Sequence, residues 1–196
     1  SHPQFKAKNL REVIDLSKSD PHGISYGTSG TGGTPHIAGE LLKQRTGANL
    51  THIPYKGAAP AVQGLISGET QFICDSISTS HPQVKTGRLR GLAVGSANRL
   101  SGVLSTLPTL IEQGFPDLKA VTWLMMLYPT GTPKALRQTI HTAVNSIVRN
   151  PEVEAKLITI GLQPRLSNSV DESDDYLASE YRFWTDVVKR SGIQKE

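Results

Sequence analysis

The stretch that decides the fold reads Tyr26-Gly27-Thr28-Ser29-Gly30-Thr31-Gly32-Gly33-Thr34-Pro35-His36. It joins a short strand pattern to a helical pattern, with Thr34 as the expected N-cap and Pro35 as the first helical residue. Glycines let a ligand approach backbone N–H groups, and a helix that begins here directs its unpaired N–H groups and positive dipole end into the loop. The stretch therefore predicts a strand–loop–helix unit that holds an anion, against the alternative of a glycine-rich turn that binds nothing.

This loop matches none of the enzyme signatures that it resembles superficially. The GxSxG elbow needs glycine where the chain has Thr31, and the phosphate loop of NTPases needs a lysine that Gly32-Gly33-Thr34 lacks. The GxGxxG pattern meets Pro35 where its third glycine belongs. No base is recognisable beside Ser29, so binding is favoured over catalysis. The alternative is an α/β enzyme that acts on a phosphorylated or acylated substrate held at the loop.

Composition narrows the classes of protein further. The chain has 196 residues and 37% hydrophobic content without a long apolar run, which suits one large or two small domains and predicts no membrane span. The net charge of +4 comes from scattered residues, and we interpret the densest group, Lys85, Arg88 and Arg90, as solvated surface rather than a nucleic-acid site. Cys74 lies in an apolar run and is expected to be packed. The histidines have no metal-ligand spacing, so neither a metal nor a cofactor is expected.

Hydrophobic periodicity predicts alternating helices and strands over the first 95 residues. The first expected helix has Leu10, Val13 and Ile14 at helical spacing and ends near Asp20-Pro21. The other expected helices cover Pro35–Thr46, Ala58–Ile66 and Thr79–Thr86, and the expected strands cover Ile24–Tyr26, Leu50–Pro54, Gln71–Asp75 and Leu89–Gly95. This rhythm is typical of a mainly parallel sheet with helices on both faces.

The pattern changes after Gly95. A short helix is expected over Pro108–Gln113 and an apolar strand over Val121–Tyr128, and three helices follow, from Pro133, from Pro151 and over Val170–Arg190. In the last helix, Tyr176, Leu177, Tyr181, Trp184, Val187 and Val188 are expected to face a core. These helices have little sheet of their own to cover, so we expect their apolar stripes to be poorly covered within this chain.

Backbone donors at two loops are the candidate ligand site. The residues are Ser29, Gly30, Thr31, Gly32, Gly33 and Thr34 in the first loop, and Gly57 and Ala58 at the start of the helix expected over Ala58–Ile66. Lys56 is a candidate partner for the anion, and His36 is expected to pack under the first loop. Asp75 ends a strand beside both loops, either as a structural acceptor or as a contact for a ligand amine or hydroxyl. Two separated helix starts favour a dicarboxylate.

Several segments, in matching order and spacing, resemble the substrate-binding receptors of bacterial tripartite tricarboxylate transporters, the Bug receptors. Tyr26–Leu42 is similar to the family's YGSSGxGSPxHLAGELF, His52–Ala61 to its HVPYKGxAPA, and Gly87–Arg99 to its GKLRALAVTSxxR. Pro108–Pro116 and Trp123–Pro133 are similar to PTVAEAGxPG and WxGLLAPAGTP. The resemblance covers nearly the whole chain.

Some positions depart from this pattern. Thr28 replaces a serine and Gly33-Thr34 replace Ser-Pro, changes that keep small or hydroxyl character, whereas Met125-Met126 stand where the family tends to have glycine. These departures leave the identity of the ligand open. Ser1–Phe5 match the core of an affinity tag, but they also resemble the family's lead-in, which Ala7–Val13 continue, so we interpret them as native sequence.

The resemblance implies an α/β fold of the periplasmic-binding-protein type, a type II-like Venus flytrap whose two lobes close on a small carboxylate without catalysis. Residues 7–120 would form lobe two, the complete α/β ligand-binding domain. Residues 121–196 would supply the crossover strand and C-terminal helices of lobe one, whose N-terminal part is absent.

The same resemblance implies a periplasmic solute receptor, with no signal sequence in this chain, that delivers its carboxylate to the membrane components of a tripartite tricarboxylate transporter. No nucleic acid is expected as a partner. A homo-oligomer or a swapped assembly of the fragment would cover the apolar stripes.

Overall fold

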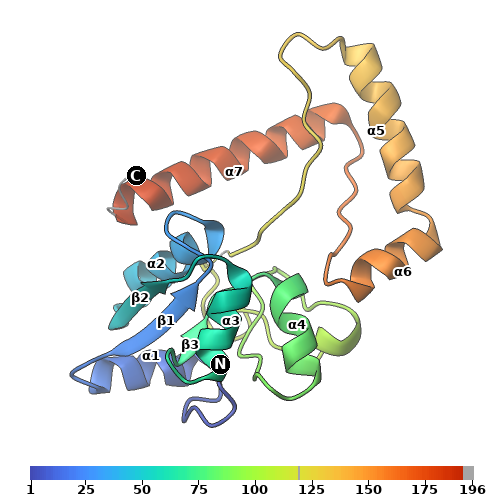
Figure 1. Cartoon of the computed structure of the whole chain (residues 1–196). Helices are drawn as coiled ribbons and strands as arrows, with labels where there is room; N and C mark the ends of the chain where they lie inside the picture. The colour runs from blue at the N-terminus through green and yellow to red at the C-terminus, as the bar shows by residue number, and fades with distance from the viewer. Residues whose placement is uncertain (119, 192–196) are drawn as a thin grey trace. The chain divides into compact units, whose positions relative to one another are not determined.

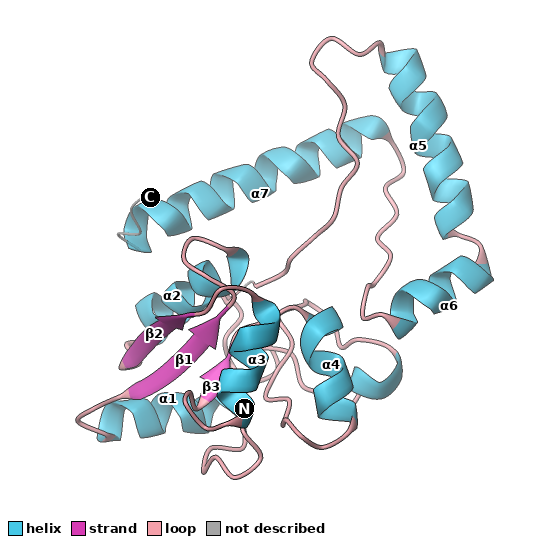
Figure 2. Ribbon diagram, viewed as in Figure 1, coloured by secondary structure: helices cyan, strands magenta, loops and turns pink. Residues whose placement is uncertain are grey.

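The computed structural model describes residues 1–118 and 120–191, and the chain divides into two compact units. The first unit spans Ser1–Thr122 and the second spans Trp123–Arg190. Figure 1 follows the chain through both units, and Figure 2 shows that the strands belong to the first.

The first unit is built on a parallel sheet of three strands in the order β2-β1-β3. β1 (Ile24–Thr28) pairs along its whole length with β2 (Leu50–Pro54) and at two positions with β3 (Phe72–Ile73). Four helices accompany the sheet: α1 (Leu10–Ser19), α2 (Thr34–Thr46), α3 (Ala58–Ile66) and α4 (Ile77–Lys85). The step from β1 to β2 and the step from β2 to β3 run in opposite directions across the sheet. Right-handed crossovers therefore place α2 and α3 on opposite faces, with α3 in front in Figure 1.

Burial follows the periodicities that the sequence predicts. α1 buries Leu10, Val13, Ile14 and Ser17, one stripe of a helix. Tyr26 in the central strand is fully buried, and its ring lies 5.6 Å from that of Phe72, measured between centroids. The parallel sheet and flanking helices confirm the predicted α/β class.

The expected strand over Leu89–Gly95 is wrong. Arg90 exchanges backbone hydrogen bonds with Ser1, at 2.7 and 2.8 Å, whereas Val94 pairs with Pro108 and Leu110, both at 3.0 Å. Because the segment divides its backbone groups between two neighbours, only an isolated bridge between Val94 and Thr109 forms.

Three other elements differ from their predicted bounds by a few residues or in kind. The third strand is limited to Phe72–Ile73 instead of Gln71–Asp75, and the helix expected from Thr79 begins at Ile77. The short helix expected over Pro108–Gln113 is a single turn, closed by a 3.2 Å bond from the Gln113 N–H to the Thr109 carbonyl.

Arg90 is not the solvated surface charge that we expected. Its guanidinium donates to the carbonyl oxygens of Pro3, Phe5 and Ala7, at 3.0 Å for Phe5 and 3.2 Å for Ala7. The side chain thus fastens the first seven residues to the rest of the unit.

We expect Arg90→Ala to lower the free energy of unfolding by about 2 kcal/mol, because charge-assisted bonds to three carbonyls disappear together. Arg90→Lys should recover only part of this, since an ammonium lacks the planar fork. Urea denaturation measures the change, and Arg88→Ala, at an exposed position nearby, is the control. Equal midpoints for the two alanine variants would show that these contacts contribute nothing.

The second unit contains α5 (Lys134–Val148), α6 (Pro151–Thr159) and most of α7 (Val170–Ser191). α5 and α6 contribute no buried residue. In α7, Val187 is buried as expected, but Tyr181 is 74% exposed, which corrects its predicted place in a core. Glu180 is fully buried and accepts bonds from the indoles of Trp123 and Trp184, at 3.0 and 3.1 Å.

Val121–Tyr128 does not form the predicted strand. Within residues 1–118 and 120–191, no backbone hydrogen bond joins this segment to a neighbouring strand. Leu124, Met126 and Leu127 are 82%, 61% and 63% exposed. A strand requires a partner, and the described part of the chain supplies none. No helix in that part is long and apolar enough to cross a membrane.

Candidate functional site

Three helix N-termini meet one edge of the sheet. The strands are parallel, so their carboxyl ends at Thr28, Pro54 and Ile73 share an edge, which we call the carboxyl edge. Each strand leads within a few residues into a helix, and none of the N-caps, which are Gly33 for α2, Gly57 for α3 and Ser76 for α4, makes a side-chain capping bond. The first N–H groups of the three helices therefore lack intrahelical acceptors and present partial positive charge.

The first two loops of this edge are fastened to each other. The Tyr55 N–H donates to the Thr28 carbonyl at 3.0 Å, and the Gly57 N–H donates to the Ser29 carbonyl at 3.1 Å. Gly30 and Gly32 have φ of 144° and 77°, a conformation that favours glycine. The segment Ser29–Gly33, which we call the glycine loop, thus has a fixed shape beside the start of α3.

Not every N–H of the glycine loop is directed toward a ligand. The Gly32 N–H donates to Nδ1 of His36 at 3.0 Å, and the Gly30 N–H donates to Oγ1 of Thr28 at 3.3 Å. The Gly57 N–H is likewise used by Ser29. Gly30, Gly32 and Gly57 thus already use their N–H groups. Among the predicted donors, those of Ser29, Thr31, Gly33, Thr34 and Ala58 make no hydrogen bond within the described part of the chain.

The predicted site residues differ in solvent exposure. Thr31, Gly32, Gly33 and Lys56 are exposed, and Ser29, Gly30, Thr34, Gly57, Ala58 and Asp75 are half-buried. The exposed ammonium of Lys56 lies in the loop before α3 and can approach an anion only from the solvent side. The third helix start, Ser76-Ile77, was missed because the helix was expected to begin at Thr79. The pair Asp75-Ser76 after an apolar run was an available N-cap signal.

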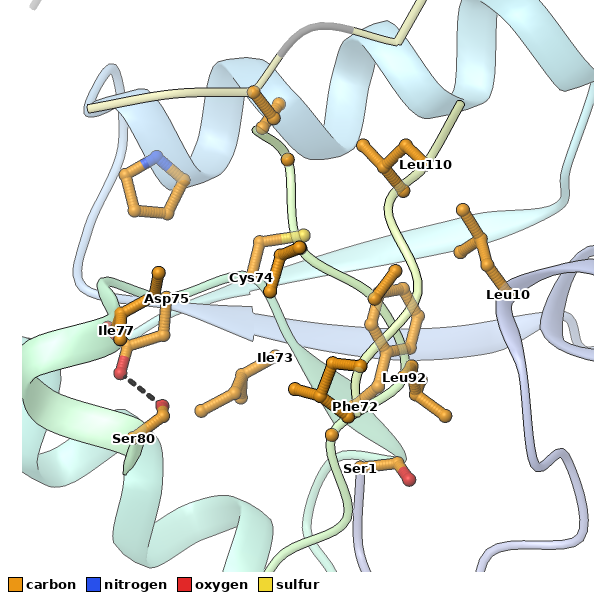
Figure 3. A pocket seen from close by; sticks show the side chains of 18 of the residues that line it. Ser1, Leu10, Phe72, Ile73, Cys74, Asp75, Ile77, Ser80, Leu92 and Leu110 are labelled. Carbon is orange, nitrogen blue, oxygen red and sulfur yellow. Dashed lines mark hydrogen bonds between the residues drawn. The ribbon is translucent and has the colours of Figure 1, made fainter. Parts of the chain in front are cut away.

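Asp75 has a structural role at the third helix start. Its carboxylate accepts a bond of 2.5 Å from Oγ of Ser80, drawn in Figure 3, and it also accepts the Ser76 N–H. Burial raises the pKa of this carboxyl, and these two bonds oppose the rise. Of the two interpretations of Asp75, the structural acceptor is therefore the one that its contacts favour.

A cavity of about 230 Å³ opens beside Asp75 inside the first unit. Thr34 and Pro35 from the start of α2 line it together with Cys74, Asp75 and Leu92, and aliphatic side chains form most of its wall (Figure 3). Burial raises the pKa of the Cys74 thiol to about 12, so the thiol stays protonated at neutral pH and is not a nucleophile. Its mostly apolar wall suits an aliphatic group.

The part of the chain that the structure describes brings no recognisable catalytic group or metal-ligand set to this site. Among the residues that the structure describes, no three His, Cys, Asp or Glu side chains gather to hold a metal ion. In the same residues, Ser29 has no hydrogen bond to a histidine or a carboxylate. The arrangement can bind an anion, and within the described residues no base lies in hydrogen-bond contact with Ser29 to activate it as a nucleophile.

Comparison with known proteins agrees with this geometry. Residues 1–193 match the family described as "Tripartite tricarboxylate transporter family receptor". Protein BugT of Bordetella pertussis is 28% identical over 99% of this chain and 59% of its own length. The chain therefore spans about 59% of that relative.

Two solved structures share the fold. "R. palustris Rpa4515 with adipate" is 31% identical with a TM-score of 0.82, covering 97% of this chain and 63% of that one. The periplasmic binding protein BugD is 26% identical with a TM-score of 0.79, covering 100% of this chain and 65% of that one. The family is one of receptors and BugD is a binding protein, which confirms the preference for binding over catalysis. The chain belongs to the receptor family of the tripartite tricarboxylate transporters.

Proposed function

We propose that this chain is the ligand-binding part of a periplasmic solute receptor that takes up a small dicarboxylate and delivers it to the membrane components of a tripartite tricarboxylate transporter. One carboxylate would bind at Gly33 and Thr34, and the second would lie toward Ala58. The observation that carries the proposal is the convergence of three helix N-termini without side-chain caps on the carboxyl edge. Such termini favour small anions, and each charge-assisted bond contributes roughly 1.5 to 3 kcal/mol.

The division of the chain supports a receptor with two lobes. We propose that residues 7–120 form lobe two and that residues 121–196 belong to lobe one. A receptor of this kind encloses its ligand between lobes, so we expect the 196-residue chain alone to bind weakly. The solved structure of Rpa4515 with adipate makes adipate the rational first ligand to test.

Gly33→Val should abolish adipate binding by blocking approach to the N–H groups at the start of α2. Gly33 is suited to this test because its φ of −73° accommodates a side chain, and the nearest atom to an added Cβ is Cδ of Pro35 at 3.7 Å. The loss of a glycine N-cap costs only about 1 kcal/mol, so the fold should survive. Binding is measured by titrating ¹⁵N-labelled protein with adipate and following the amide shifts, which detects weak complexes.

Three controls define the outcome. Asn9→Ala removes an N-cap bond from α1 at a similar energetic cost and should leave adipate binding unchanged. Lys56→Ala should weaken binding about fivefold at most, because an exposed ion pair contributes 1 kcal/mol or less. Hexanoate, with one carboxylate on the same carbon chain, should bind more weakly than adipate. Unchanged affinity in Gly33→Val would remove the glycine loop from the site.

A further inference from the structure

Two histidines lie stacked directly under the glycine loop. His36 belongs to the first turn of α2 and His52 to β2, and their ring centroids are 3.8 Å apart with an interplanar angle of 10°. His36 is only 7% exposed, whereas histidine is a residue type of intermediate burial. Tyr26 also packs against His52, at 5.1 Å between ring centroids. The stack is thus wedged between the central strand and the loop.

Hydrogen bonds from this stack reach the loop at two points. Nδ1 of His36 accepts the Gly32 N–H at 3.0 Å. Nε2 of His52 lies 2.7 Å from Oγ1 of Thr28, whose hydroxyl donates to the Gly30 carbonyl at 2.9 Å. A hydroxyl has one proton, so Nε2 of His52 must then be the donor to Thr28.

The first of these bonds fixes the protonation state of His36. An imidazole nitrogen accepts a bond only when it carries no proton, so His36 must be neutral with its proton on Nε2. Protonation of Nδ1 would place two N–H donors 3.0 Å apart, and Gly32 would have to move away. Protonation of both rings would also bring two positive charges together in the stack.

We infer that His36 is a positioning residue for ligand binding, which holds the glycine loop through Gly32 and releases it when His36 becomes protonated. The expected effect on ligand binding rests on the proposed carboxylate site. The hydrogen bond between His36 and Gly32 belongs to the loop itself and can be tested without a ligand.

The charged groups around the stack come from the same helix and the central strand. Oε1 of Glu40 lies 3.9 Å from Nε2 of His36, and it also accepts bonds from Tyr26 Oη at 3.0 Å and Lys43 Nζ at 2.9 Å. Because Lys43 and Tyr26 already engage this carboxylate, it gives a protonated His36 limited support. Burial is the main reason why the pKa of His36 lies below its usual value of 6.5. Burial is also the main reason why the pKa of His52 is lowered to about 4.

The sign of the pH effect follows from these lowered pKa values. Both histidines keep their neutral form to a lower pH in the folded unit than in the unfolded chain. The contribution of the stack to stability is therefore complete above pH 6.5 and is lost as the pH falls through the lowered pKa values of the folded unit, which is about 4 for His52. The bond from Gly32 to His36 is lost as the pH falls through the lowered pKa of His36 itself. The loop should be ordered at neutral pH and released in acid.

The test needs no ligand, because exchange of the Gly32 amide shows directly whether its hydrogen bond to His36 is formed. Hydrogen exchange followed by NMR on the 196-residue chain should show the Gly32 amide protected about fivefold more at pH 7.5 than at pH 4.5, after correction for intrinsic rates. His36→Asn places an amide oxygen near the position of Nδ1 and cannot titrate, so it should protect Gly32 equally at both pH values. His36→Leu offers no acceptor and should leave Gly32 unprotected at both. The amides of β1 report whether the unit remains folded.

Protection of Gly32 in His36→Leu, or protection in the wild-type chain that does not change with pH, would overturn the inference. Adipate titrations at pH 7.5 and 5.5 form a second arm. The affinity of the wild-type chain should fall more than that of His36→Asn, and the titration of adipate itself cancels in this comparison. If the Gly32 amide behaves as expected while adipate binds at neither pH, the positioning role stands and the proposed ligand class fails.

Discussion

Gly39→Ala should destabilise the first unit by about 3 kcal/mol and lower its melting temperature by about 10 °C. A Cβ at position 39 would lie 2.3 Å from Cε2, 2.4 Å from Cζ and 2.5 Å from Oη of Tyr26. The ring cannot withdraw easily, because Tyr26 is fully buried between His52 and Phe72, and its hydroxyl bonds Glu40 at 3.0 Å. Overpacking of this kind forces the backbone or the rotamer to shift.

The sign of the stability change in Gly39→Ala shows whether helix propensity or the clash with Tyr26 dominates. In an unconstrained helix, glycine to alanine stabilises by about 1 kcal/mol, and Gly39 lies in the interior of α2. We expect the clash with Tyr26 to outweigh this gain. Thermal and urea denaturation measure the sum, and Tyr26→Leu provides the matched background, since it removes the ring that a new Cβ would meet. If Gly39→Ala costs as much in the Tyr26→Leu background as in the wild-type chain, the clash is not the cause.

Gly39 also connects the fold to the candidate site. It lets α2 approach β1 closely, and the same helix carries His36 on its first turn and starts at the glycine loop. A helix pushed away from the sheet would withdraw the His36 ring from His52. The Gly32 amide should therefore lose protection in Gly39→Ala even at pH 7.5, which exchange measurements on this variant would show.

Local signals account for what the sequence predicted well. Leu50–Pro54 and Ala58–Ile66 have the predicted bounds, and α2 ends at Gly47, whose φ of 66° is the left-handed conformation of a helix stop. Turn and cap residues decide these boundaries within a few positions of the chain. Most element bounds within residues 24–66 could therefore be predicted from the sequence alone, although β1 continues to Thr28 instead of ending at Tyr26, and the N-cap of α2 is Gly33 instead of Thr34.

Non-local partners account for what the sequence could not predict. Leu89–Gly95 has the composition of a strand, but its hydrogen bonds depend on Ser1 and Pro108, which lie far away in sequence. The same holds for the site. The glycines of the loop could be predicted from sequence, whereas the bond from Gly32 to His36 and the stack with His52 depend on how α2 and β2 are placed.

Val121–Tyr128 should become strongly protected from hydrogen exchange in a longer protein that carries the part of lobe one implied by the family resemblance. In the 196-residue chain, this segment is extended and without ladder bonds among the described residues, and Leu124, Met126 and Leu127 are largely exposed. A cavity of about 620 Å³ borders it inside the second unit, where Nε of Arg137 and Nδ1 of His141 are buried without a hydrogen-bond partner among the described residues. A strand beside this segment would supply backbone partners and cover apolar side chains worth roughly 1.5 to 3 kcal/mol each.

Hydrogen exchange measured by mass spectrometry on the 196-residue chain and on the longer protein tests this prediction. In the 196-residue chain, the amides of this segment should exchange near the intrinsic rate. In the longer protein their exchange should be slower on the order of 10⁴-fold, as for a strand whose amides exchange only when the whole lobe unfolds. Met126→Pro removes one backbone donor, so it should destabilise the longer protein and leave the shorter chain unchanged. Light scattering distinguishes a second copy as the cover, because a dimer would protect the segment without any added sequence. A monomeric short chain that already protects Val121–Tyr128 would show that residues 121–196 complete their own core, and the assignment of this region to an incomplete lobe would be wrong.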